Sequence, residues 1–244
     1  MFDTNELRDY QRTLDSIYFG ANSKDELSLS KWCDRTRTTA QAVRILHDEV
    51  NKRYEGEKHR FSTQENNKRW EDAQVDRKAF DDIARAKIEK DLDSVLSAKK
   101  TAFSKAMAAP DEASVRLLQT LQMRQNLSAA EISATVEHLS GNLQSLAVLS
   151  EIASKNHVAF PKLNTDFLST EDEVRDAVRT LLDNLFSDSP TYMTRLFLNE
   201  TGMNGQLRPY VDALDSPAWL TCDISQIKDN PNDDLTGGDT DASA

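Results

Sequence analysis

Residues 71–96, EDAQVDRKAFDDIARAKIEKDLDSVL, decide the fold of this chain. The stretch contains neither proline nor glycine, and its apolar residues recur every three or four positions, which is the period of an α-helix. Two neighbouring helical faces carry these residues: Val75, Ala79, Ile83 and Ala86 on one, and Phe80, Ala84, Ile88, Leu92, Val95 and Phe103 on the other. The pattern predicts a long helix with limited burial.

The same period extends toward the N-terminus. Val43, Leu46, Val50, Tyr54 and Phe61 follow one another at steps of 3, 4, 4 and 7 residues, which is the spacing of a narrow coiled-coil seam. Between residues 24 and 109 the chain has no proline and one glycine. Residues 23–109 are therefore predicted to form a long helical arm.

The arm is either one helix or two. Residues 55–69 are almost wholly polar, and Ser62-Thr63-Gln64-Glu65 has the spacing of a capping box that could begin a new helix. A continuous helix over 25–108 would extend roughly 120 Å at ~1.5 Å per residue, and a break near 56–63 would fold it into an antiparallel hairpin about half as long. The scarcity of glycine and proline favours the single helix, with the hairpin as the alternative.

The arm has too few apolar side chains to form a core alone. Only 38% of the chain is hydrophobic and 29% is charged, so much of the arm should face water. Trp32, Trp70 and Phe103 nevertheless need a partner helix or another chain to cover them. We predict self-association of the arm. The predicted self-association residues are Val43, Leu46, Val50, Tyr54, Phe61, Trp70, Ile83, Ile88 and Leu92.

The predicted fold class is all-α, with the arm flanked by other segments. Residues 1–22 should hold a short amphipathic helix over 4–18. Pro110-Asp111 marks a helix start and the domain boundary, and residues 110–222 are predicted to form a small helical bundle, in which Ser128 and Glu131 have capping-box spacing and Asn142 caps a helix. Residues 223–244 contain six Asp against one Lys and should be a disordered acidic tail.

The net charge of −11 lies in the second half of the chain. Residues 1–109 hold 21 Lys or Arg against 20 Asp or Glu, whereas residues 110–244 hold 9 against 21. This excess of carboxylates repels phosphate and anionic lipid, so neither nucleic acid nor a membrane is an expected partner. Cys33 and Cys222 form no metal or disulfide motif, and the polar N-terminus lacks a signal peptide, which together favour a cytoplasmic protein.

No residues with a catalytic, cofactor-binding or metal-binding pattern are found. None of the four histidines, His47, His59, His138 and His157, has the Glu-x-x-His spacing of di-metal bundles, and glycine-rich phosphate loops are absent. Residues 229–234 lack the glycine and glutamate of a calcium loop. Residues 143–154 contain no Lys or Arg, which disfavours a DNA-reading helix there. Basic clusters at 35–37, 52–53, 58–60 and 68–69 alternate with acids, as on a solvated helix face.

Residues 117–153 resemble helical proteins of tailed bacteriophages that infect Gram-positive hosts. The resemblance covers about forty residues and is carried by Leu117-Leu118, Leu121, Arg124, Leu127-Ser128, Glu131, Leu139, Gly141-Asn142, Leu146, Leu149 and Ile152-Ala153. It implies a virion structural or scaffolding-like role, with a capsid or other virion protein as partner and the host cytoplasm or the virion as location. Scaffolding proteins often end in a basic capsid-binding helix, whereas residues 223–244 are acidic.

The sequence thus favours a non-enzymatic structural or assembly protein that acts through helical self-association. The alternative is a helical regulatory module that recognises a host or viral protein. An enzyme that uses an unrecognised carboxylate site is a third hypothesis.

Overall fold

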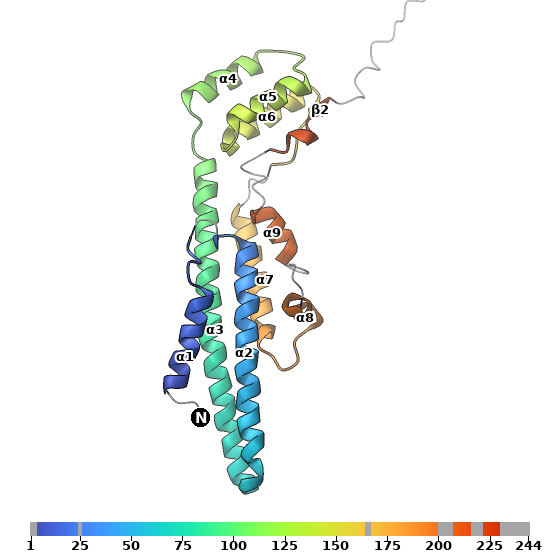
Figure 1. Ribbon diagram of the computed structural model, residues 1–244. Coiled ribbons are helices and arrows are strands. Elements are labelled where there is room, and N and C mark those ends of the chain that lie inside the picture. Colours follow the sequence, from blue (N-terminus) through green and yellow to red (C-terminus); the bar gives the residue numbers. More distant parts are fainter. Residues whose placement is uncertain (1–3, 24–25, 164–166, 200–206, 216–221, 230–244) are drawn as a thin grey trace, which may run out of the picture. The chain divides into compact units, whose positions relative to one another are not determined.

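The computed structural model describes residues 4–23, 26–163, 167–199, 207–215 and 222–229 (Figure 1). The predicted all-α class is confirmed. The described helices are α1 (Thr4–Ile17), α2 (Leu29–Glu57), α3 (Thr63–Ala106), α4 (Glu112–Gln122), α5 (Ala129–Leu139), α6 (Leu143–Lys155), α7 (Phe167–Leu185), α8 (Tyr192–Asn199) and α9 (Arg208–Asp215). None of these helices has the length and apolar character needed to cross a membrane.

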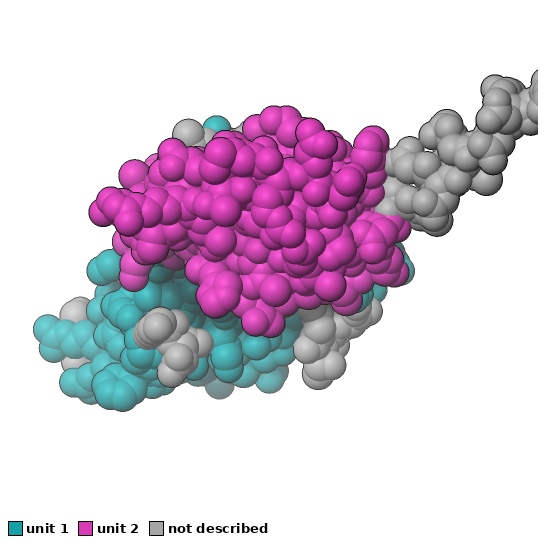
Figure 2. All heavy atoms as spheres, turned by 90° about the horizontal axis from the view of Figure 1, so that it is seen from above, with its two compact units in different colours: residues 1–99, 168–216 teal, residues 100–167, 217–244 magenta. Residues whose placement is uncertain are grey.

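The chain divides into two compact units, coloured separately in Figure 2. Unit 1 comprises residues 1–99 and 168–216, and unit 2 comprises residues 100–167 and 217–244. The predicted bundle of residues 110–222 is therefore divided, because α8 and α9 contact α2 and α7 pairs with α3 through Arg175 and Asp93, 2.7 Å apart. The arm is covered by later helices of its own chain.

Helices α2 and α3 form an antiparallel hairpin (Figure 1), so the favoured single helix was wrong and the hairpin alternative holds. A 3-10 turn, η2 (Lys58–Arg60), ends α2. The Ser62 hydroxyl and backbone N–H donate to the Glu65 carboxylate at 2.7 and 2.9 Å. The Glu65 backbone N–H in turn donates to the Ser62 hydroxyl at 3.4 Å. This capping box starts a new helix where neither glycine nor proline marks a break.

One hydrophobic core cluster of unit 1 lies between α1 and the hairpin. Tyr10 packs edge-on against Phe80, with ring centroids 5.0 Å apart, and its hydroxyl donates to the Phe80 carbonyl at 3.2 Å. Of the two apolar faces of α3, the one that contains Phe80 and Ile88 is buried, whereas Val75 on the other is 66% exposed. Burial is thus complete on one face of α3 and partial on its neighbour, where Ile83 is half-buried and Val75 faces solvent.

A buried ion pair joins the two arms of the hairpin. Arg35 on α2 donates from Nε and Nη2 to the two carboxylate oxygens of Asp91 on α3, at 2.8 and 3.2 Å. Arg35 is 7% exposed and Asp91 6%, and Glu26 accepts from Arg35 Nη1 at 3.1 Å. Burial raises the pKa of Asp91, while the hydrogen bonds from Arg35 oppose that shift. The alignment of α2 along α3, called the hairpin register here, must therefore place Arg35 opposite Asp91.

Asp215, the last residue of α9, fixes the start of α2. Its two carboxylate oxygens accept from the backbone N–H groups of Leu29 and Ser30 at 2.8 and 2.7 Å, and Lys99 lies 3.2 Å away. A helix predicted to begin at Ser23 thus begins at Leu29, with Ser28 as its N-cap. The negative carboxylate also suits the positive end of the helix dipole.

Replacing Asp215 by alanine should lower the free energy of unfolding by about 1–2 kcal/mol, the usual cost of losing a helix cap. The half-buried carboxylate satisfies two N–H donors that are left without partners in the variant. Asp212 on the same helix is a matched control, because its side chain is exposed and its ion pair with Arg208 is long, at 3.9 Å. Urea unfolding followed by circular dichroism measures both; equal stability of the two variants would contradict the cap.

Unit 2 packs α4, α5 and α6 around an apolar cluster that includes Leu121, Ile132 and Leu149. The predicted capping box at Ser128 and Glu131 is confirmed, and hydrogen bonds to the Ser128 backbone are the main reason that the pKa of Glu131 is lowered. Strands β1 (Val158–Ala159) and β2 (Lys228–Asp229) pair antiparallel. Residues 223–229, predicted to be disordered, instead contain a 3-10 turn and β2, and residues 230–244 lie outside the described residues.

Candidate functional site

The most exposed cluster of large aromatic residues in the hairpin lies at its tip, defined here as residues 52–72. Trp70 packs on Tyr54 with ring centroids 4.9 Å apart and an interplanar angle of 54°. The Arg69 guanidinium lies over the Phe61 ring, 4.2 Å from its centroid. Phe61 is 37% exposed and Trp70 39%, so these rings present apolar surface to solvent in fixed positions.

The hairpin turn positions these rings. Asn66, in the first turn of α3, donates from Nδ2 to the carbonyl of Lys58 at 2.7 Å and to that of Phe61 at 3.2 Å. Ser62, which follows Phe61, forms a capping box with Glu65. The hydrogen bonds from the Ser62 hydroxyl and backbone N–H lower the pKa of Glu65. Because the turn is bonded internally, Phe61 is fixed between the two helices.

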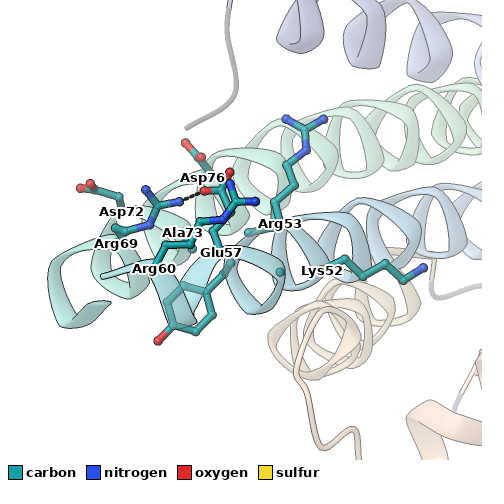
Figure 3. A pocket seen from close by; sticks show the side chains of 11 residues that line it. Lys52, Arg53, Glu57, Arg60, Arg69, Asp72, Ala73 and Asp76 are labelled. Carbon is teal, nitrogen blue, oxygen red and sulfur yellow. Dashed lines mark hydrogen bonds and ion pairs between the residues drawn. The ribbon is translucent and has the colours of Figure 1, made fainter. Parts of the chain in front are cut away.

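A hollow of about 530 Å³, to whose lining Tyr54 contributes, lies between both arms of the hairpin (Figure 3). Lys52, Arg53 and Arg60 contribute positive charge to it, and Asp72 and Asp76 contribute negative charge. Arg69 pairs with Glu57 across the hollow. Over residues 58–70 there are four Lys or Arg against one Glu, so the end of the hairpin is basic in an otherwise acidic protein.

The structure separates the predicted self-association residues into three groups. Tyr54, Phe61 and Trp70 come together at the tip. Leu46 and Ile83 are half-buried against the unit 1 core. The remaining four are buried within the chain itself: Val43, Val50, Ile88 and Leu92. These four are not available to a second copy, because the other arm of the hairpin and the flanking helices already cover the seam.

A second apolar surface lies between α1 and α2 and was not predicted from the sequence. This α1–α2 groove has a volume of about 380 Å³ and an apolar floor of Tyr10, Ala42, Ile45 and Leu46. Ile45 is 68% exposed. In the sequence Ile45 stands directly before the seam residue Leu46 but off the seam itself, and this extra apolar residue is a signal that could have indicated the groove.

His47 and both cysteines are held in structural roles. His47 Nε2 lies 2.8 Å from Asp81 Oδ1, and its Nδ1 lies 3.4 Å from Arg77 Nη2, so both ring nitrogens face partners within unit 1. Cys33 and Cys222 are free and buried, and burial raises the pKa of each thiol, that of Cys222 to about 11. These thiols are poor nucleophiles near neutral pH.

The tip has the chemistry of a protein-docking surface. Tyrosine, tryptophan and arginine are the residues that dominate binding energy at protein interfaces. Within the described parts of the chain, no group of three or more His, Cys, Asp or Glu side chains is arranged to hold a metal ion. Comparisons of this chain with protein-family models, curated proteins and solved structures found no match.

Proposed function

We propose that this chain is a non-enzymatic structural or assembly protein that associates with copies of itself through the hairpin tip. The observation that carries the proposal is the pair of partly exposed rings, Phe61 and Trp70, held by Arg69 and Tyr54. A ring that is already fixed loses little conformational entropy on binding, so covering its apolar surface contributes more to affinity.

The size of the tip argues for reversible association. Covering a fully exposed large apolar side chain contributes about 1.5–3 kcal/mol, and Phe61 and Trp70 are already more than half covered. The two rings together should therefore contribute on the order of 2 kcal/mol to each contact. Polar contacts at the basic end of the hairpin supply specificity and association rate.

A virion assembly role is the more specific form of the proposal. The resemblance of residues 117–153 to helical phage proteins supports a scaffolding-like or minor virion protein, with a capsid or other virion protein as a further partner in the host cytoplasm or the virion. Reversible self-association fits such a role, because assembly proteins must form and release contacts repeatedly.

Replacing both Phe61 and Trp70 by serine should raise the dissociation constant for self-association at least tenfold, because the rings supply most of the apolar surface of the tip. Sedimentation velocity over a concentration series measures this constant. Val75→Ser is the matched control, since Val75 lies on α3 outside the tip and is 66% exposed.

Circular dichroism should show full helical content in both variants. If the tip variant associates as strongly as the wild type and the control, the tip is not the docking surface. If the wild-type protein stays monomeric at every concentration, the self-association hypothesis is contradicted. The alternative, a regulatory module that binds a different protein, is then favoured.

A further inference from the structure

The α1–α2 groove has an excess of acidic side chains along its edge, whereas the end of the hairpin, residues 58–70, has an excess of basic ones. Glu6, Asp9 and Glu49 stand at the edge of the groove, where Arg53 pairs with Glu6 and Glu49, at 2.7 Å in each case. The residues that line the groove include three acids, Glu6, Asp9 and Glu49, and one Arg, Arg53. The groove is thus mildly acidic, while residues 58–70 of the tip are basic.

The basic side chains of the tip include two that no described residue neutralises. Arg69 pairs with Glu57 and Lys58 with Glu55, whereas Arg60 and Lys68 are exposed and no ion pair of the described residues includes them. Arg60 directly precedes Phe61 in the sequence, and Lys68 lies on the same helix as Trp70, two residues before it. The tip therefore combines apolar surface with free positive charge.

We infer that the α1–α2 groove receives the hairpin tip of a second copy of this chain, an inference that rests on the proposed function. Phe61 and Trp70 of one copy cover Ile45 and Leu46 of the other. Arg60 and Lys68 approach the acidic edge of the groove. The groove supplies an apolar floor for the two rings and carboxylates for the two cations that make no ion pair within the described residues.

The positions of the two surfaces allow a closed pair. Both belong to unit 1, and Ile45 lies about 20 Å from the end of α2 at the helical rise of ~1.5 Å per residue. Two hairpins that lie antiparallel side by side can each place their tip on the groove of the other. Such a twofold contact uses the same two surfaces twice, which closes the assembly at a dimer and doubles the area buried by one tip.

A charge-reversal experiment tests this contact. The tip variant is Arg60→Glu with Lys68→Glu, and the groove variant is Asp9→Lys with Glu49→Lys. All four side chains are exposed. The ion pairs of Asp9 with Arg12 and of Glu49 with Arg53 are also exposed, so losing them should change stability little. Each variant alone should associate at least tenfold more weakly than the wild type, because like charges meet at both contacts of the pair.

An equimolar mixture of the two variants should restore association. In a mixed pair, the negative tip meets the positive groove and the unchanged tip meets the unchanged groove, so both contacts are complementary. A single chain that carries all four substitutions should likewise associate with itself. Sedimentation velocity measures the association of each variant, of the mixture and of the fourfold variant, and circular dichroism checks their helical content. If the charge reversal unfolds the tip, Arg60→Ala with Lys68→Ala provides a milder variant.

The outcomes separate this inference from the proposed function. If the tip variant loses association and the groove variant keeps it, the tip docks elsewhere and the inference is wrong while the proposed function stands. If both variants weaken association and the mixture fails to restore it, the pairing of tip with groove is overturned. If the wild type never associates, both this inference and the proposed function are overturned. The remaining hypothesis is then that the groove binds a basic helix of another protein.

Discussion

Asp91→Ala is expected to lower the free energy of unfolding by about 3–5 kcal/mol, the cost of removing one partner from a buried ion pair. The substitution leaves the guanidinium of Arg35 inside the hairpin, where it is 7% exposed, with Glu26 as the remaining carboxylate partner. Two hydrogen bonds between α2 and α3 are lost with it. Urea unfolding followed by far-ultraviolet circular dichroism measures the change.

Two controls show whether burial is the cause. Glu112→Ala removes one partner of an exposed ion pair with Arg116 on α4, and its effect should be below about 0.5 kcal/mol. Replacing both Arg35 and Asp91 by leucine should recover most of the loss, because burial raises the pKa of Asp91 and the pair itself is costly to bury. A small effect of Asp91→Ala would contradict the hairpin register.

Trp32→Ala should destabilise the protein by about 3–5 kcal/mol, as expected for removing a large aromatic side chain from a core. Trp32 lies on α2 and is completely buried, and its indole Nε1 donates to the carbonyl of Ile88 on α3 at 3.0 Å. The chain's own α3 is therefore the partner helix that Trp32 requires, and no second copy is needed to cover it.

The second tryptophan of the hairpin is the matched control. Trp70→Ala removes a ring that is 39% exposed and should cost clearly less stability, on the order of 1 kcal/mol. Trp32→Phe keeps most of the packing and loses the hydrogen bond to Ile88, so its cost should be about 1 kcal/mol. Equal loss from Trp32→Ala and Trp70→Ala would contradict the different burial of the two side chains.

Local signals predicted the helices of this fold well. The 3.6-residue period predicted helix throughout the arm, and the short-range caps at Ser128 and Asn142 correctly predicted helix starts. The capping box at Ser62 indicated the hairpin that was held as the alternative. These features depend on residues three or four positions apart, which a sequence displays directly. The single helix was wrongly favoured over the hairpin because the scarcity of glycine and proline was given more weight than the capping box.

Long-range pairings could not be predicted in the same way. Asp215 caps a helix 185 residues earlier in the chain, and Arg35 meets Asp91 only in the register that the hairpin sets. The apolar seam that contains Val43 and Ile88 was correctly predicted to need a cover, but a period of apolar residues does not say whether that cover is another copy or the same chain. Only Tyr54, Phe61 and Trp70 of the predicted set gather at the exposed tip.

Sedimentation equilibrium of the wild-type protein over a wide concentration range tests the central claim most directly, because it measures molecular mass without assuming a shape. The chain has a mass of 27.5 kDa. Self-association through the tip predicts that the average mass rises with concentration toward that of a dimer, and that the Phe61 and Trp70 double variant stays near the mass of one chain. A wild-type mass of 27.5 kDa at every concentration would contradict the proposed function.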